Sequence, residues 1–461
     1  MASKPGAAEQ FRRLTTRTSL TEVFNDYLQD STAAGRDGTT AELFKRNLAN
    51  EVRLVNHALR ADRYQFGHYR QHLISKGAGK IPRVISIPTM RDKLVLKAIA
   101  ILIGSLFPEA RTELPQTKIA RLIAAIESSK FDRYLRVDVR EFYPSVPHDF
   151  LRAFLKKRIR KPSLLSLVMS SVRTTTLPSG APKTSEVNSV GVPQGLAVSN
   201  ILAEICLVDL DEHFESLPHL AYFRYVDDII VLFNADAEAD LIDDLFGRLS
   251  ALQLTPHPLG VSNSKSEVGD LADGFDYLGY VLQSPRVSVR NASITKLEAS
   301  LVKVFTGYKY ARKRRRRSNW PQQCVDICEW RLNLVITGCV FDGARRGWLA
   351  YFSQIRHHQL LHHFDLHVAT LLARFGLQTR FKPKTFVAAY RFAARRRTDT
   401  SGYVPNFDKM TSNEQRFILE RYFLMEAQTL LRLADVEIAR IFHRKIKRLV
   451  VELDQDVMSI S

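Results

Sequence analysis

The sequence predicts an α+β protein, with a mixed region of strands and helices between two mostly helical regions. Residues 10–130 follow a helical pattern that is broken at 31–40 and by the strand-like segment 74–89. Residues 131–282 alternate between β-branched runs and helical runs, and the chain becomes helical and strongly basic after about residue 285. The expected parts are residues 1–130, 131–284, 285–345 and 346–461.

The first helical region contains one long apolar run and one basic hairpin. LVLKAIAILIGSLF (94–107) is too short to cross a bilayer and includes Lys97, so it is expected to be a core helix. ISKGAGKIPRVISIPT (74–89) combines glycine, proline and alternating apolar residues, which favours a β-hairpin that carries Lys76, Lys80 and Arg83.

The mixed region is expected to contain strands and helices that pair across long gaps in sequence. The expected elements, in chain order, are the strand YLRVDV (134–139), the helix HDFLRAFLKKRI (148–159), the loop GVPQGLAVSN (191–200), the helix ILAEICLVDL (201–210), a strand pair at FRYVDDIIVLF (223–233) and the helix AEADLIDDLFGRL (237–249). Ser199 and Asn200 are expected to cap the helix at 201–210, although a plain junction between loop and helix is the alternative.

Composition favours a polyanionic partner. The chain has 67 Lys and Arg against 48 Asp and Glu, a formal net charge of +19, which suits nucleic acid or an anionic membrane surface. The start, MASKPGAAEQFRRL, has no apolar stretch typical of a secretion signal. Four cysteines in 461 residues suggest reduced, unbound thiols and hence a cytoplasmic location, and we expect no membrane association.

Adjacent carboxylates in a buried strand need cations. Asp227 and Asp228 lie between the apolar runs FRYV and IIVLF, whereas the Asp-Asp pair in LIDDLF (241–246) can face water from a helix. Asp138 ends another β-branched strand. If the two strands are neighbours, the three carboxylates converge on a hard-oxygen site suited to Mg²⁺, with Mn²⁺ as the substitute. Two such ions about 4 Å apart suit an in-line phosphoryl transfer.

The ordered set of motifs resembles the reverse transcriptase family. The set runs KGAGKIPRVISIP, RVDVREFYPSV, GVPQGLAVSN, the YVDD box, NSKSEV and FDYLGY, and it covers roughly residues 35–282. The core is similar to group II intron and retron enzymes. The plan of a compact core with a helical C-terminal extension resembles bacterial defence-associated reverse transcriptases, although the resemblance weakens past residue 282. The resemblance implies a right-hand polymerase fold: fingers in 1–130, palm in 131–284, thumb in 285–345 and a helical basic extension in 346–461.

The resemblance also implies roles for individual residues in an RNA-directed DNA polymerase. Asp138 and Asp227 would bind both Mg²⁺ ions, Asp228 would complete the metal-binding carboxylates, and Lys265 would protonate the leaving pyrophosphate. The residues implied in binding the incoming deoxynucleotide are Lys76, Arg83, Tyr143, Gln194 and Gly195. The Tyr143 ring would collide with a ribose 2′-hydroxyl, while Phe142 belongs to the core. A solvated hairpin is the alternative for Lys76 and Arg83, and a surface lysine for Lys265.

FDYLGY (275–280) matches the primer grip, with a packing role as the alternative for Tyr277 and Leu278. The basic run RKRRRR is expected to bind nucleic acid through Arg312, Lys313, Arg314, Arg315, Arg316 and Arg317. The implied partners are an RNA template, which a dedicated structured non-coding RNA would supply, deoxynucleotides and an RNA–DNA duplex. An effector protein and a second copy of the chain stay open as partners.

The biological role implied by the resemblance is antiphage defence. Two other functions remain open from the sequence. The same active site could carry out untemplated or protein-primed DNA synthesis, or the core could be an inactive RNA-binding scaffold. The complete set of motif residues counts against the scaffold.

Overall fold

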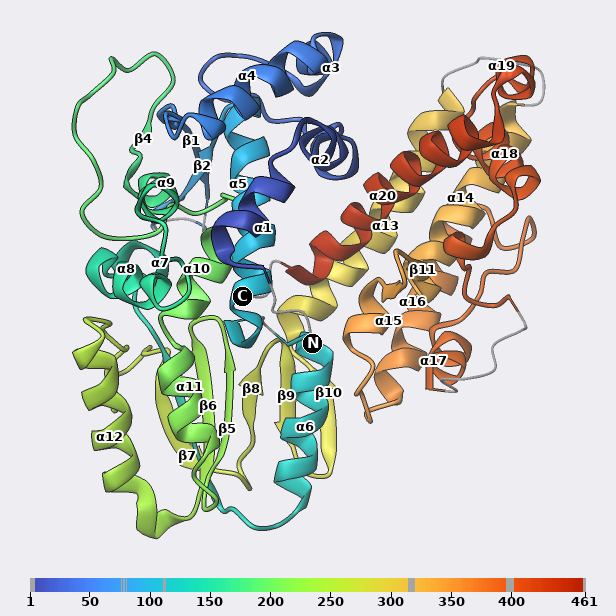
Figure 1. Ribbon diagram of the computed structural model, residues 1–461. Coiled ribbons are helices and arrows are strands. Elements are labelled where there is room, and N and C mark those ends of the chain that lie inside the picture. The colour runs from blue at the N-terminus through green and yellow to red at the C-terminus, as the bar shows by residue number, and fades with distance from the viewer. Residues whose placement is uncertain are drawn as a thin grey trace. The chain divides into compact units, whose positions relative to one another are not determined.

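The computed structural model describes residues 5–75, 77, 79, 81–110, 113–313, 320–394 and 402–458 (Figure 1). The chain forms two compact units. Unit 1 comprises Met1–Glu113 and Lys130–Gly269, and unit 2 comprises Leu114–Ser129 and Asp270–Ser461. The α+β prediction is confirmed, while the predicted boundaries of fingers, palm, thumb and extension stay a prediction.

Unit 1 holds most of the strands. Its helices are α1 (Ala7–Leu14), α2 (Arg17–Val23), α3 (Ala41–Arg46), α4 (Leu48–Arg60), α5 (Met90–Leu106), α7 (Phe142–Ser145), α8 (His148–Lys156), α9 (Pro162–Arg173), α10 (Ser199–Ile205), α11 (Val208–Glu215) and α12 (Glu238–Ala251). Its strands are β1 (Tyr69–Ile74), β2 (Arg83–Ile87), β3 (Arg133–Asp138), β4 (Thr176–Leu177), β5 (Ala221–Tyr225), β6 (Asp228–Phe233) and β7 (Glu267–Asp270), the last of which ends in unit 2.

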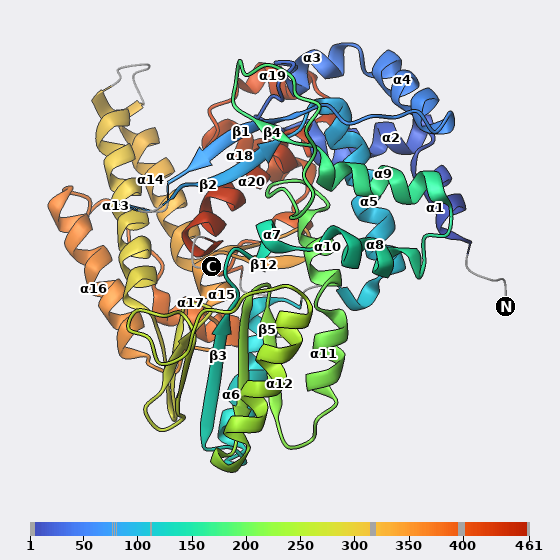
Figure 2. The ribbon, with the colours of Figure 1, turned by 90° about the vertical axis from the view of Figure 1, so that its left-hand side faces the viewer.

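A four-stranded sheet in the order β5-β6-β3-β7 forms the centre of unit 1. β6 pairs antiparallel with both β5 and β3, and its residues 229–233 are fully buried. Helices α11 and α12 cover one face of this sheet (Figure 2). Leu241, Leu245 and Leu249 recur every four residues along α12, so one helix face is apolar and packs into the core.

The core helix is confirmed, and the predicted hairpin exists, but its first strand, β1, lies almost entirely before the predicted segment 74–89. β1 and β2 pair antiparallel, and β4 joins β1 in parallel. Helix α5 is buried over most of its length, as its apolar composition predicts. The single helix expected at 201–210 is instead two helices, because the chain leaves helical hydrogen bonding at Cys206 and Leu207 between α10 and α11.

Unit 2 is mainly helical. Its helices are α6 (Pro115–Glu127), α13 (Asn291–Lys313), α14 (Trp320–Thr337), α15 (Trp348–Tyr351), α16 (Gln359–Arg374), α17 (Phe386–Ala394), α18 (Ser412–Arg421), α19 (Ala427–Arg432) and α20 (Asp435–Met458). Strands β8 (Phe275–Tyr277), β9 (Tyr280–Gln283) and β10 (Arg286–Val289) form one antiparallel sheet, and β11 (Cys339–Phe341) pairs with β12 (Ala344–Arg346).

Four further observations concern unit 2 and the chain as a whole. An ion pair between Glu127 and Arg356 ties α6 to the segment before α16. Tyr277 and Leu278 are buried, which supports a packing role for FDYLGY. Across the whole chain, all four cysteines are buried and free of disulfides. Among the described residues, the model contains no helix with the length and apolar character that a membrane span requires.

Candidate active site

A tight turn between β5 and β6 carries Asp227. Val226 in this turn has a φ of +60°, a backbone conformation that β-branched residues rarely adopt. The buried Arg224 donates a hydrogen bond from Nη1 to the Val226 carbonyl oxygen at 2.8 Å. The core therefore supports this strained turn directly beside the carboxylate.

Strands β3 and β6 bring the predicted carboxylates to one end of the sheet. Asp138 and Asp228 face each other in antiparallel register. The backbone N–H of Val139 donates to the Asp227 carbonyl oxygen at 3.2 Å. The expectation that these two strands are neighbours is confirmed, and three acidic residues share one edge of a buried sheet.

Asp138 lies against two basic side chains. It is 8% exposed, and Lys265 Nζ donates to its two carboxylate oxygens at 3.0 and 3.1 Å. His257 Nε2 lies 3.3 Å from Asp138 Oδ1. Burial lowers the pKa of His257, so Lys265 supplies the opposing charge at neutral pH. His257 was missed by sequence reasoning, because a lone histidine in LTPHPLG carries no signal.

Asp228 is held by an arginine that was also not predicted. Arg136 Nε and Nη2 donate to Asp228 Oδ1 and Oδ2, each at 2.9 Å. Such a two-pronged contact is among the stronger charged hydrogen bonds in proteins. Burial nevertheless raises the pKa of Asp228, against the effect of Arg136.

The surroundings of Asp227 disfavour its ionised form. Burial raises its pKa to about 6, and the neighbouring charges of Asp138 and Asp228 act in the same direction. Lys265 opposes this rise. Burial and the neighbouring carboxylates thus disfavour the ionised form of Asp227, and a bound cation would stabilise that form.

The donor set fits a divalent metal ion in part. Carboxylate oxygens are the ligands that Mg²⁺ prefers, and Asp138 and Asp227 supply them at one sheet edge. Asp228, by contrast, is engaged by Arg136 through both oxygens. In the described parts of the chain, no three acidic, histidine or cysteine side chains are arranged as a preformed metal site. The two strands are neighbours, as predicted, but among the described residues the three carboxylates do not form a preformed metal-binding cluster.

Tyr143 and Arg83 belong to the same electrostatic neighbourhood as Asp227. Burial raises the pKa of Tyr143 to about 12, and the nearby charges of Glu204 and Asp227 add to the rise. Arg83, exposed at the first position of β2, acts in the opposite direction. Phe142 is buried, so its predicted place in the core is confirmed.

The GVPQG loop packs tightly against its protein neighbours. The backbone N–H of Ser86 in β2 donates to the Gln194 carbonyl oxygen at 2.7 Å. Gly195 has a φ of +97°, and a Cβ there would lie 2.7 Å from the Ile85 side chain. Glycine is therefore required at position 195 by β2 itself, while contact of Gln194 and Gly195 with a nucleotide stays a prediction.

The predicted capping of α10 is wrong. The N-cap residue is Val198, and it makes no side-chain cap. Ser199 instead donates its hydroxyl to the Pro193 carbonyl oxygen. Asn200 Oδ1 accepts a hydrogen bond from the Tyr143 hydroxyl at 2.8 Å. Both side chains that resembled caps therefore bind outside their own helix.

A buried ion network behind the turn was not predicted either. Arg224 Nη1 lies 2.7 Å from Glu204 Oε2 in α10, and Arg224 Nε donates to Asp211 Oδ1 in α11 at 2.7 Å. The one available signal was an arginine inside the apolar strand AYFRY, since a charge there needs buried partners.

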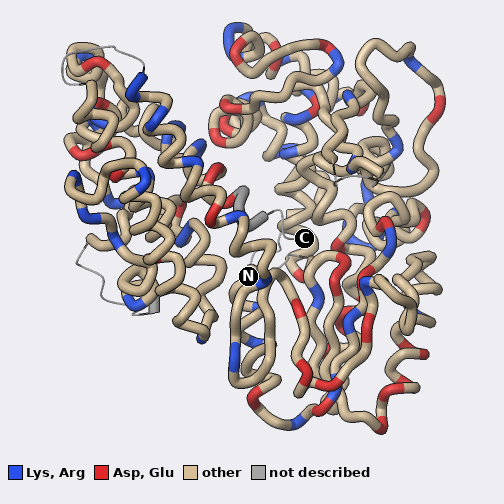
Figure 3. Tube along the Cα trace, turned by 180° about the vertical axis from the view of Figure 1, so that it is seen from behind, with Lys and Arg blue, Asp and Glu red and all other residues tan. Residues whose placement is uncertain are grey.

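Part of the predicted cation set lies outside the described residues. Lys76 and Arg314–Arg317 belong to this group. Arg312 and Lys313 are exposed at the end of α13 in unit 2. Positions of lysine and arginine recur along the helices of unit 2, α20 among them (Figure 3).

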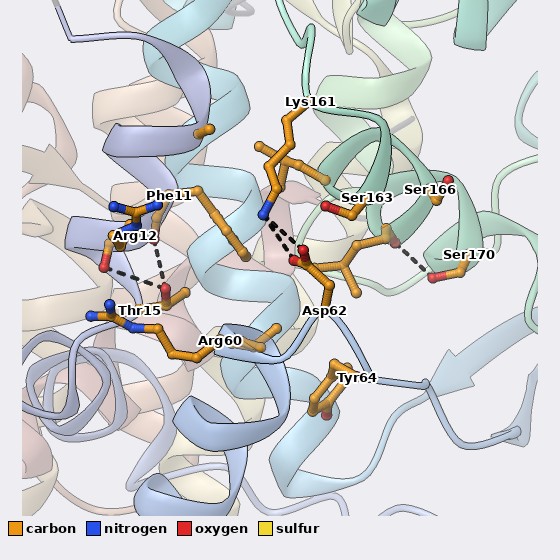
Figure 4. A pocket seen from close by; sticks show the side chains of 14 residues that line it. Phe11, Arg12, Thr15, Arg60, Asp62, Tyr64, Lys161, Ser163, Ser166 and Ser170 are labelled. Carbon is orange, nitrogen blue, oxygen red and sulfur yellow. Dashed lines mark hydrogen bonds and ion pairs between the residues drawn. The ribbon is translucent and has the colours of Figure 1, made fainter.

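The cavity in Figure 4 is not lined by Asp138, Asp227 or Asp228. Its volume is about 410 Å³, and α1, α4 and α9 contribute to its lining. Lys161 and Asp62 form an ion pair at 2.9 Å on its wall. None of the predicted site residues lines it.

Residues 74–282 match the family model described as reverse transcriptase (RNA-dependent DNA polymerase). The chain is 22% identical over 298 residues to protein YkfC of Escherichia coli K12, covering 54% of this chain and 75% of that protein. It is 29% identical over 167 residues to an uncharacterized 91 kDa protein in the cob intron of Schizosaccharomyces pombe, covering 35% of this chain and 20% of that protein.

Solved structures that match this chain include a telomerase from Candida albicans in complex with a fragment of telomeric RNA. That match covers 91% of this chain and 69% of the telomerase, with 12% identity and a TM-score of 0.42. A partial Cas6-RT-Cas1–Cas2 complex matches 54% of this chain and 43% of that chain, with 16% identity and a TM-score of 0.31.

Proposed function

We propose, from the premise that residues 74–282 are a reverse transcriptase domain with a right-hand polymerase fold, that this chain is an RNA-directed DNA polymerase. In finer terms, it transfers a deoxynucleotide onto a primer 3′-hydroxyl with two bound Mg²⁺ ions. The single observation that supports this best is the antiparallel register of Asp138 against Asp228, with Asp227 adjacent.

Divalent metal ions bound by Asp138 and Asp227, with Asp228 at their side, would supply the charge that activates the hydroxyl and stabilises the leaving group. Mg²⁺ is the proposed ion, and Mn²⁺ the substitute. The raised pKa of Asp227 supports this assignment, because a bound cation would stabilise the ionised carboxylate that burial and the neighbouring carboxylates disfavour.

The remaining roles belong to side chains of the domain. Arg83 neutralises the triphosphate, together with Lys76, and Gln194 and Gly195 contact the nucleotide. Lys265, whose side chain is 62% exposed, donates a proton to the leaving pyrophosphate. Tyr143 stands beneath the sugar and excludes a 2′-hydroxyl.

The template is proposed to be a dedicated structured RNA, and the biological role to be antiphage defence. Arg312–Arg317 would contact the phosphates of that RNA or of the RNA–DNA duplex. The high net charge of +19 supports a nucleic-acid partner but does not distinguish one RNA from another.

The test compares Asp227→Ala with Asp243→Ala in the purified full chain. Asp243 belongs to the second Asp-Asp pair and is exposed on α12, so it is a matched control. Asp227→Ala should abolish deoxynucleotide incorporation on a primed RNA template and keep RNA binding, whereas Asp243→Ala should keep both. Full incorporation by Asp227→Ala would overturn the proposed site.

Sequencing of nucleic acid that co-purifies with the protein tests the template. A discrete RNA together with complementary DNA, and loss of only the DNA in Asp227→Ala, is the expected result. DNA without a complementary RNA would instead indicate untemplated or protein-primed synthesis.

A further inference from the structure

Tyr143 is fixed at both of its ends by segments distant in the sequence. Its carbonyl oxygen accepts a hydrogen bond from the Val192 N–H at 2.7 Å, which ties α7 to the GVPQG loop. Its hydroxyl donates to Asn200 Oδ1 at 2.8 Å, which ties the tip of the ring to α10. The ring is therefore held from the backbone side and from the hydroxyl side.

The loop presses closely on the segment that carries the ring. Gly191 has a φ of +85°, and a Cβ at this position would lie 2.5 Å from the Pro144 carbonyl oxygen. Only glycine allows this approach. This close packing restricts the backbone conformation at Tyr143, so the residue can change conformation mainly through its side chain.

Asn200 is not the residue that caps its own helix. α10 begins with Val198 as the N-cap residue, without a side-chain cap. Asparagine is a poor helix former, so alanine at position 200 would favour the helix. Its side-chain carbonyl oxygen accepts the hydrogen bond of the Tyr143 hydroxyl, so the Asn200 side chain links α10 to the Tyr143 ring.

We propose that Asn200 is a positioning residue that sets sugar selectivity by fixing the Tyr143 ring. This inference rests on the proposed function, in which Tyr143 excludes the ribose 2′-hydroxyl. A ring rejects an extra oxygen by steric collision only when it cannot move aside. Asn200 limits that movement through the hydroxyl at the far end of the ring.

The measurement is the ratio of kcat/KM for dGTP to that for GTP on an RNA template with a DNA primer, in the full chain with Mg²⁺. Asn200→Ala should lower this ratio about two- to tenfold, the effect expected from loss of one neutral hydrogen bond. Tyr143→Phe keeps the ring but lacks the donor, so it should lower the ratio to a similar extent.

Further variants separate positioning from a general structural effect. Asn200→Asp keeps the shape and an acceptor oxygen, so it should stay near the wild-type ratio. The double variant Asn200→Ala/Tyr143→Phe should fall no further than either single variant, because both remove the same bond. Asn50→Ala is the matched control: Asn50 is a helical asparagine whose Oδ1 accepts from Arg53 within α4.

The outcomes distinguish this inference from the proposed function. A wild-type ratio in Asn200→Ala, with deoxynucleotide selectivity intact in the unmodified chain, would overturn the role of Asn200 alone. An equal loss in Asn50→Ala would also overturn it. If the unmodified chain incorporates no deoxynucleotide on RNA, the proposed function fails and this inference falls with it.

Discussion

Arg136 and Asp228 bind each other through two parallel hydrogen bonds of 2.9 Å across neighbouring strands. Arg136 lies two residues before Asp138 on β3, and Asp228 opens β6 opposite Asp138. The guanidinium therefore holds the second aspartate of YVDD in place next to Asp138. Both side chains are mostly buried, at 20% and 16% exposed, so solvent screens this pair little.

Removing Arg136 should destabilise the protein more than removing a neighbouring arginine. Arg136→Ala leaves the Asp228 carboxylate buried without its partner, which should cost about 3 kcal/mol of unfolding free energy. Urea denaturation in the presence of a chelator measures this cost. Arg133→Ala, on the same strand and paired with Glu238 at greater exposure, should cost under about 1 kcal/mol. Equal costs would contradict the argument.

Lys265→Ala should affect catalysis far more than stability. The lysine is 62% exposed, so solvent screens its pair with Asp138, and its loss should lower the unfolding free energy less than Arg136→Ala does. Loss of a proton donor should slow single-turnover incorporation on the order of 100-fold. The control Lys157→Ala removes an exposed lysine from Asp209 and should leave the rate unchanged. A rate loss below threefold in Lys265→Ala would count against the proton-donor role.

Asp227→Asn should stabilise the metal-free protein at neutral pH. Folding raises the pKa of Asp227 from 3.8 to about 6, so its ionised form is disfavoured in the folded state. The resulting penalty grows as pH rises from about 4 to about 6 and then stays constant. Unfolding free energies at pH 4 and pH 7.5 should show a gain of at most about 3 kcal/mol for the variant at the higher pH, and little gain at pH 4. A gain of equal size at both values would refute the electrostatic cause.

Mg²⁺ should raise the melting temperature of the unmodified chain. An ion that binds only the folded state stabilises it by about 2.7 kcal/mol at a free concentration 100 times its Kd. Asp227→Asn should weaken this response strongly, because it removes one of the two carboxylates at the sheet edge that Arg136 does not hold. Asp243→Asn should respond like the unmodified chain. Thermal unfolding across a Mg²⁺ titration tests this without any activity assay.

The strands and the main helices were predictable because their signals are local. The alternation around Asp138, the apolar runs beside Asp227 and the composition of α5 each lie within about twenty residues. The partners of individual side chains could not be predicted in this way. Arg136 and Asp228 are 92 residues apart in the chain, and only the strand register decides that they meet.

Asn200 illustrates why the rest could not be predicted. Ser and Asn before an apolar helix are typical capping residues, so the local pattern favoured a cap. The helix starts at residue 199, two residues earlier than expected, and the Asn200 side chain accepts a hydrogen bond from the Tyr143 hydroxyl, 57 residues away in the chain. Local sequence shows that a side chain can form hydrogen bonds, but it does not show which group distant in the sequence becomes its partner.

The chemistry of the four thiols has a practical consequence for following motion in this protein. Cys206, Cys324, Cys328 and Cys339 are all buried, and burial raises the pKa of each. Maleimide reagents attack exposed thiolates, so the native chain should react slowly with them. A single cysteine introduced at an exposed site, such as Asp243→Cys on α12, would then accept a fluorophore selectively without prior removal of native cysteines.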